Sequence, residues 1–210
     1  DDFLVAGERY HYWAIEAPPS VALELPLQRA GLNVQWVADL APIRLRKVAI
    51  LNGAHTLLAA IGLQAGIHTV GDAVSDPDLG PFLLATLWEE IIPVLPFPEA
   101  ESRSYADDVL RRFGNPHIQH PLTAIALNME SKCVARLLPT IGRFHQTRGC
   151  LPPRLVLTLA AALSGLAEPH QHLELAMDAI PGLDEAVNTA RARIAAVGAR
   201  TALQQVEVWK

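Results

Sequence analysis

Lys47, Asn52 and His55 occur together in the apolar stretch RKVAILNGAHT, residues 46–56. An amine can act as a general base, an amide N–H can stabilise an oxyanion, and an imidazole can orient a hydroxyl. In an α-helix with about 100° per residue, these three side chains and that of Arg44 fall within one sector of roughly 140°. The spacing therefore predicts one polar face on an otherwise apolar helix.

The apolar neighbours of this polar face bear on its chemistry. Leucines on both sides predict partial burial of Asn52 and His55, and buried polar groups need a partner or a ligand. Burial and nearby cations disfavour an ammonium ion, so a lysine in this setting is expected to serve as a base. Gly53 predicts a backbone that a ligand can approach. Each residue alone has a structural explanation, but the combination favours a site.

The elements that carry this stretch follow from composition. The chain has 210 residues, half of them hydrophobic, which suits one domain or one domain with a small appendage. Residues 1–40 contain aromatic and β-branched stretches that predict two or three short strands and loops. Residues 42–210 are rich in Ala, Leu and Ile, are punctuated by Pro and Gly, and predict five or six helices. The predicted fold class is mainly α, with a few short strands near the N-terminus.

Charge, hydropathy and cysteine content narrow the function. A net charge of −5 without a long basic run argues against nucleic-acid binding. Apolar runs fall short of the roughly 18 residues that cross a membrane, so no membrane association is expected. Two cysteines make neither a disulfide framework nor a zinc site, and the default compartment is cytoplasmic. The chain opens without an initiator Met, which suggests a piece of a longer protein.

Other polar groups are weaker candidates for a site. The stretch EPHQH, residues 168–172, with Glu174 nearby, is a conceivable metal cluster, but histidines two apart do not share a helix face, and a polar loop is preferred. Glu89 and Glu90 are adjacent on a predicted helix and diverge by about 100°, which favours capping or a polar contact over paired acid/base chemistry. Cys133 lies on an apolar helix and is expected to be a buried structural thiol.

Four motifs carry a resemblance to a known family. The pattern K-x-x-x-x-N-G-x-H, here Lys47 to His55, resembles the signature of the polyol-specific long-chain dehydrogenases/reductases. GERYHYWAIE, RRFGNPHIQH and SKCVARLLPTI also resemble segments of that family, in the same order. The family includes mannitol 2-dehydrogenases, fructuronate reductases and tagaturonate reductases (altronate oxidoreductases).

The resemblance implies a two-domain NAD-dependent oxidoreductase. An amino-terminal Rossmann domain would bind NAD, and a mainly α-helical carboxy-terminal domain, similar to that of 6-phosphogluconate dehydrogenase, would carry the catalytic lysine. Residues 1–210 resemble the second domain, and no G-x-G-x-x-G turn occurs in them, so the chain alone is expected to be inactive. By resemblance, Lys47 is the general acid/base, Asn52 stabilises the oxyanion, His55 orients a substrate hydroxyl, and no metal is required.

Departures from the family pattern point to an acidic substrate. Mannitol dehydrogenases tend to have Glu where this chain has Arg44, and Arg where it has Ala124, whereas tagaturonate reductases tend to have a basic and a small residue there. Arg44 or Lys132 would bind a uronate carboxylate through charge-assisted hydrogen bonds. Ala49 stands where the family usually has Arg. The expected reaction interconverts tagaturonate and altronate.

Three alternatives stay open at the level of sequence. Two belong to the same family, namely mannitol 2-dehydrogenase and fructuronate reductase. The third is a helical interaction module without catalysis, which would place Lys47, Asn52 and His55 on separate solvent-exposed surfaces. The enzyme hypothesis instead predicts an exposed apolar face around them, against which the Rossmann domain would dock.

Overall fold

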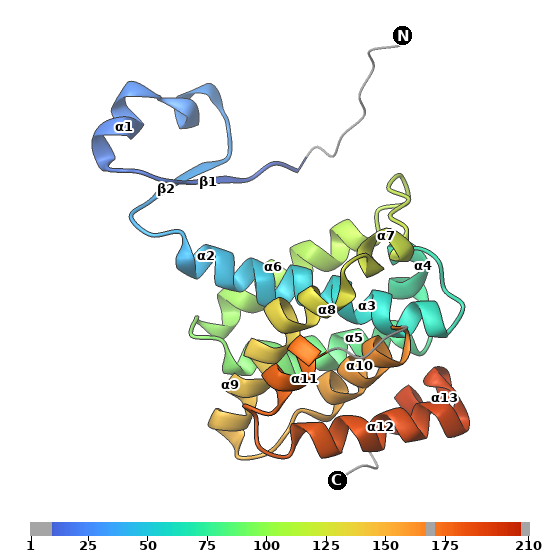
Figure 1. The fold of residues 1–210 in the computed structure, drawn as a ribbon. Helices are drawn as coiled ribbons and strands as arrows, with labels where there is room; N and C mark the ends of the chain where they lie inside the picture. The colour runs from blue at the N-terminus through green and yellow to red at the C-terminus, as the bar shows by residue number, and fades with distance from the viewer. Residues whose placement is uncertain (1–9, 167–170, 207–210) are drawn as a thin grey trace. The chain divides into compact units, whose positions relative to one another are not determined.

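The computed structural model describes residues 10–166 and 171–206, and the chain divides into two compact units, Asp1–Leu45 and Arg46–Lys210 (Figure 1). The smaller unit contains a two-stranded parallel sheet of β1 (Trp13–Glu16) and β2 (Val34–Val37), with Trp13 opposite Val34. Both strands lie in the segments where β-branched and aromatic residues predict them.

The connection between the two strands is helical. Parallel neighbours need a crossover rather than a tight hairpin. The crossover consists of α1 (Pro19–Glu24) and the 3₁₀ turn η1 (Leu27–Ala30). Pro19 begins α1, which is favourable because the first helical position needs no N–H donor.

Among the residues described, the larger unit is helical apart from an isolated β-bridge between Thr69 and Pro121. After α2 (Ala41–Arg46), which spans the boundary between the units, the α-helices are α3 (Gly53–Gln64), α4 (Val70–Ser75), α5 (Leu79–Ala85), α6 (Glu99–Phe113), α7 (Leu122–Ala126), α8 (Met129–Lys132), α9 (Leu138–Arg148), α10 (Pro153–Ser164), α11 (Gln171–Met177), α12 (Leu183–Val197) and α13 (Ala199–Gln204). Three π-helical segments, η2 (Lys47–Asn52), η3 (Thr86–Ile91) and η5 (Cys133–Leu137), and the 3₁₀ turn η4 (Ile92–Val94) complete the order. The mainly α fold is as predicted, but five or six helices is too few.

Two of the π-helical segments explain part of this difference. Pro93 closely follows η3, and Pro139 closely follows η5. Proline has no N–H, and its ring clashes with the carbonyl four residues earlier, so an α-helix cannot continue through it unchanged. Stretches that read as single helices are therefore divided.

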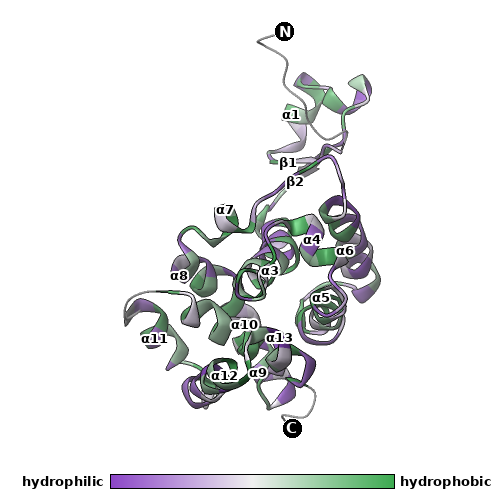
Figure 2. Ribbon diagram, turned by 90° about the vertical axis from the view of Figure 1, so that its right-hand side faces the viewer, coloured by the Kyte–Doolittle hydropathy of each residue, from purple (hydrophilic) through white to green (hydrophobic). Residues whose placement is uncertain are grey.

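Helix α3 lies at the centre of the larger unit and positions the site (Figure 2). Its side chains are buried on all sides, as in Leu57 and Leu58, because it contacts α4, α5, α7, α10 and α13. Gly62 permits the approach of α7, since an added Cβ would lie 2.7 Å from Leu122 Cδ1. None of the described helices is long and apolar enough to span a membrane.

Candidate active site

Lys47 and Asn52 begin and end the π-helical segment η2, which leads directly into α3. The α-helical spacing assumed from the sequence is therefore wrong across this segment. Because π-helical hydrogen bonds join residues five apart, Lys47 and Asn52 are separated by about one turn. Three further α-helical residues turn the chain by about 300° and bring His55 back towards the side of Lys47. The π turn thus gathers the three side chains more closely than an α-helix would.

The three side chains differ in burial. Asn52 and His55 are half-buried, as predicted, but Lys47 is exposed, so the described residues do not give it the apolar surroundings expected from the sequence. The preceding residue, Arg46, fixes the start of the π turn against α6. Its guanidinium lies 4.9 Å from the centre of the Tyr105 ring and 3.9 Å from a carboxylate oxygen of Glu101.

Gly53 does not open the backbone to a ligand, contrary to the expectation. The residue is buried, and an added Cβ would lie 3.7 Å from Val48 O and 4.0 Å from Ile91 Cδ1. These are ordinary contact distances, so alanine would fit. The glycine faces the core between η2 and η3 rather than a substrate.

His55 lies among aromatic and cationic side chains. Its ring stacks on Phe113, with centroids 4.3 Å apart and an angle of 22°, and meets the His120 ring edge-on at 5.1 Å. Burial, followed by the positive potential of His120, Arg136, Arg112 and Lys132, lowers the pKa of His55 to about 3. His55 is therefore a neutral imidazole at physiological pH.

The two predicted carboxylate-binding residues have different placements. Lys132, at the end of α8, is half-buried and donates a hydrogen bond from Nζ to Ile125 O at 2.6 Å. Burial, and then Arg136, lowers the pKa of Lys132, which belongs to the charged surroundings of His55. Arg44 is an exposed residue of α2 in the smaller unit, and its role stays a prediction.

Arg136 contacts the helix that carries His55, and the sequence did not single it out. Its Nη1 donates to Thr56 Oγ1 at 3.2 Å, and Thr56 Oγ1 donates to Asn52 O at 2.9 Å. A usable signal existed, because Arg136 stands four residues after Lys132, a spacing that places two side chains on one helix face.

Arg112 and His120 were also missed. Both lie in RRFGNPHIQH, which carries part of the family resemblance but suggested no role for either residue. We define the His55 cluster as His55, Arg112, His120, Lys132 and Arg136.

The acidic pair on η3 is structural, as predicted. Glu89 is exposed, whereas Glu90 is 2% exposed and accepts hydrogen bonds at 2.9 Å from the backbone N–H groups of Arg154 and Leu155. Glu90 thus caps the first turn of α10 and pairs with the Arg154 guanidinium. Burial, opposed by these hydrogen bonds, raises the pKa of Glu90 to about 7.

The remaining candidates carry no catalytic arrangement. Cys133 is fully buried, as predicted, and burial raises its thiol pKa to about 12. Residues 167–170, with most of the EPHQH stretch, lie outside the described residues. Within the described parts, no group of three or more His, Cys, Asp or Glu side chains is arranged to hold a metal ion.

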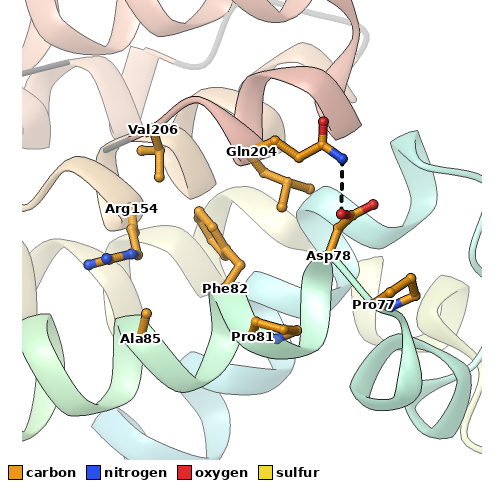
Figure 3. Close-up of a pocket in the computed structure, with 9 residues that line it drawn as sticks. Pro77, Asp78, Pro81, Phe82, Ala85, Arg154, Gln204 and Val206 are labelled. Atoms are coloured by element: carbon orange, nitrogen blue, oxygen red, sulfur yellow. Dashed lines mark hydrogen bonds between the residues drawn. The ribbon is translucent and has the colours of Figure 1, made fainter. Parts of the chain in front are cut away.

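A cavity of about 330 Å³ lies between α5, α10 and α13 (Figure 3). Its lining includes Phe82, Asp78, Gln204 and Arg154. The charged groups there already have protein partners, because Gln204 donates to Asp78 and Arg154 pairs with Glu90. None of the predicted site residues lines this cavity.

The expected exposed apolar face is not formed by the helix that carries Lys47. No large apolar side chain between residues 46 and 64 is exposed. Ile118 and Leu127, which are 38% and 66% exposed, lie instead in the segments that precede His120 and Lys132.

Comparisons with known sequences give the chain its relatives. The family model described as the mannitol dehydrogenase C-terminal domain matches residues 39–210. The altronate oxidoreductase of Bacillus subtilis (strain 168) is 48% identical over 163 residues, which are 78% of this chain and 34% of that protein. An altronate oxidoreductase of Klebsiella pneumoniae is 45% identical over 164 residues, with the same two shares. The chain thus spans about a third of the length of these relatives.

Solved structures agree on the fold. The mannitol 2-dehydrogenase of Pseudomonas fluorescens, in a ternary complex with NAD and D-mannitol, superposes with a TM-score of 0.71 at 22% identity, over 86% of this chain and 44% of that one. A substrate-free D-sorbitol dehydrogenase gives a TM-score of 0.72 at 24% identity, over 85% and 43%. The predicted mainly helical fold class is confirmed.

Proposed function

Because the chain belongs to the family of mannitol dehydrogenase C-terminal domains, we propose that it is the catalytic and substrate-binding domain of an NAD-dependent oxidoreductase that interconverts tagaturonate and altronate. The observation that supports the proposal is the π turn over Lys47–Asn52, which leads directly into the helix that carries His55. Helix geometry then predicts that the three side chains lie on one side of that turn. The choice of tagaturonate and altronate as substrates is based on the altronate oxidoreductases among the relatives.

Lys47 handles the proton. In the oxidation direction its neutral amine takes the proton of the reacting hydroxyl, and in reduction its ammonium form returns a proton to the developing alkoxide. NAD, when bound, accepts or supplies the hydride at the carbinol carbon. The exposure of Lys47 leaves its amine accessible to a second domain.

Asn52 and His55 would act on the substrate oxygens. The half-buried amide of Asn52 donates a hydrogen bond to the oxyanion at the reacting carbon, and one preorganised donor of this kind contributes about 3 kcal/mol to transition-state stabilisation. His55 stays neutral because its pKa is about 3, so it does not compete with Lys47 for the proton. A neutral imidazole offers one N–H donor and one acceptor, which suits the orientation of a neighbouring hydroxyl.

The dinucleotide would be bound mainly outside this chain, by the amino-terminal Rossmann domain of the same protein. The described residues contain no unit in which a strand, a glycine-rich turn and a helix follow one another, as a pyrophosphate site requires. The chain instead provides the side chains that move the proton and hold the substrate.

The test is NADH oxidation by the full-length natural protein, offered tagaturonate, fructuronate and fructose separately. We expect turnover of tagaturonate that falls about 10²- to 10⁴-fold in Lys47→Ala, with unchanged circular dichroism. A small primary amine added to Lys47→Ala should restore part of the rate, because it replaces the missing base.

The matched control is Arg191→Ala, which removes an exposed cation from α12 and should leave the rate unchanged. Fructuronate or fructose as the preferred substrate would reassign the enzyme within its family. A folded protein that binds NADH but reduces none of the three would support a non-catalytic helical module.

A further inference from the structure

The His55 cluster gathers three cationic side chains and the His120 imidazole from separate parts of the chain around the neutral His55 ring. Arg112 comes from α6, His120 from the segment before α7, Lys132 from α8 and Arg136 from η5. His120 contacts the His55 ring directly, and the other three contribute to the positive potential there. The potential at the site therefore favours an anion.

Lys132 and Arg136 are held in place by neutral groups. Their hydrogen bonds go to a backbone carbonyl, Ile125 O, and to a hydroxyl, Thr56 Oγ1. Within 10–166 and 171–206, neither side chain pairs with a carboxylate. Both are half-buried, and a cation in that environment is normally neutralised by a partner. The missing countercharge is the feature that a ligand would supply.

Arg136 is the better placed of the two for recognition. The contact with Thr56 uses one of the five N–H donors of a guanidinium, and the others suit a bidentate bond to a carboxylate. Thr56 follows His55 on α3 and also bonds to Asn52 O. This relay fixes the guanidinium against the same turn that carries Asn52 and His55.

We infer that Arg136, with Lys132 beside it, binds the carboxylate of the sugar-acid substrate and thereby selects an acidic substrate over a neutral polyol. The inference rests on the proposed function, since it assigns the substrate class of that same site. A neutral polyol cannot supply the missing negative charge, whereas a hexuronate places a carboxylate at the end of the chain opposite its hydroxymethyl group.

The experiment compares Arg136→Gln, Arg136→Lys and wild type in the full-length natural protein. The KM of each is measured for tagaturonate, for fructose and for NADH. In Arg136→Gln we expect the KM for the uronate to rise roughly 10- to 100-fold, because charge-assisted hydrogen bonds to its carboxylate are lost. The KM values for fructose and NADH should stay within about twofold. Arg136→Lys should recover part of the uronate affinity because it keeps the charge. Arg148→Gln, which neutralises an exposed cation of α9, is the matched control.

Four outcomes would overturn the inference. An equal loss for uronate and fructose in kcat would make Arg136 a positioning residue for the Asn52 turn. A raised KM for NADH would assign the guanidinium to the dinucleotide pyrophosphate. An unchanged uronate KM beside an active wild type would remove Arg136 from recognition and leave the proposed function intact, whereas a wild type that reduces no uronate would defeat both.

Discussion

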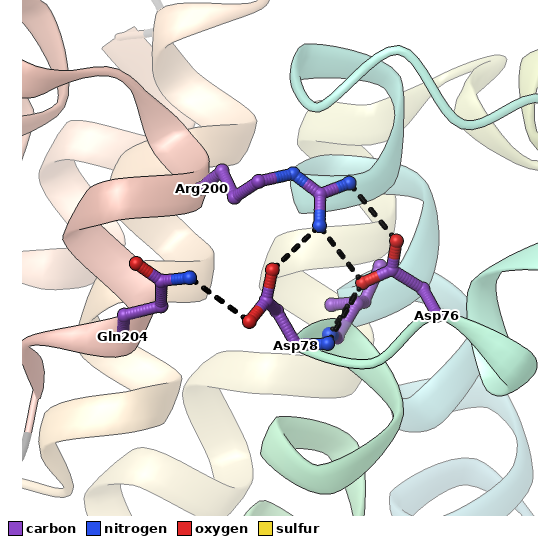
Figure 4. A network of polar contacts seen from close by, with 5 residues as sticks. Asp76, Asp78, Arg200 and Gln204 are labelled. Carbon is purple, nitrogen blue, oxygen red and sulfur yellow. Dashed lines mark hydrogen bonds and ion pairs between the residues drawn. The ribbon is translucent and has the colours of Figure 1, made fainter.

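Cationic side chains in two parts of the larger unit differ in what neutralises them. Arg200 bonds to the carboxylates of Asp76 and Asp78, and Gln204 also donates to Asp78 (Figure 4). Lys132 and Arg136 of the His55 cluster instead bond to a carbonyl and a hydroxyl. We call Arg200, Asp76, Asp78 and Gln204 the Arg200 network.

The difference separates structural charges from functional ones. The Arg200 network joins α13 to the start of α5 and is balanced by its own residues, as is the buried Arg154 with Glu90. The His55 cluster concentrates positive charge without a carboxylate on Lys132 or Arg136. Unbalanced, partly desolvated charge is unfavourable for folding, so its presence is best explained by binding of an anion.

The largest expected change in stability comes from a buried charge that has protein partners, Glu90. Glu90→Ala leaves two N–H groups at the start of α10 without an acceptor, and leaves Arg154 with the exposed Glu89 as its remaining carboxylate among the described residues. We expect the free energy of unfolding, measured in urea, to fall by about 3 kcal/mol. Glu89→Ala is the control and should cost less than about 1 kcal/mol, because that side chain is exposed. Equal losses in the two variants would contradict the assignment of Glu90 as the cap.

Much of the proposed site rests on the sequence, because side-chain types carry the chemistry. Lys47, Asn52 and His55 were recognisable from one short motif, and the strands from β-branched and aromatic residues. The π turn was not predictable from periodicity, since α-helical and π-helical turns use the same residues and tertiary packing decides between them. The expectation that Lys47 lies in apolar surroundings was wrong for a related reason, because burial depends on which parts of the chain cover a side chain.

Arg136 shows more clearly what cannot be predicted from the sequence. Its partner Thr56 is 80 residues earlier in the chain, and no local pattern links the two. The same is true of Glu90 and Arg154, which are 64 residues apart. A sequence shows that a charged residue exists, but whether it is balanced depends on contacts between distant helices.

Acid titration separates the two groups by pH. The pKa of His55 is about 3 in the folded protein, against 6.5 normally, so the unfolded chain binds this proton first as the pH falls. The His55 contribution to stability is complete above pH 6.5 and is lost progressively towards pH 3. We expect His55→Gln to remove this decline when unfolding free energies are measured from about pH 7 down to about pH 4.

The Arg200 network responds at lower pH. A hydrogen bond from Arg200 lowers the pKa of Asp76, and bonds from Gln204 and then Arg200 lower that of Asp78. Their stabilisation is present above the ordinary pKa of 3.8 and is lost below it. Arg200→Ala should therefore change the profile in that lower range. A change produced by His55→Gln in that lower range alone would contradict the assignment.

Glu90 changes the stability in the opposite direction as the pH falls. It is present in both wild type and His55→Gln. Its raised pKa, about 7 against 4.5, means that the folded state retains the proton between these values. Its contribution is therefore present below pH 4.5 and is lost as the pH rises towards 7. The difference between wild type and His55→Gln, rather than either profile alone, isolates the histidine.

The smallest expected change in stability comes from Lys132, a cation of the His55 cluster that has no carboxylate partner among the described residues. Lys132→Met removes a cation whose hydrogen-bond partner is a carbonyl, and it relieves repulsion from Arg136 while keeping apolar volume. We expect the free energy of unfolding to stay the same or rise slightly, while the affinity for a uronate falls. Added uronate should therefore stabilise wild type against thermal unfolding more than it stabilises Lys132→Met, because binding to the folded state alone raises stability. If Lys132→Met instead destabilised the protein as much as Glu90→Ala, Lys132 would be a structural charge, and the contrast between the two groups of cations would disappear.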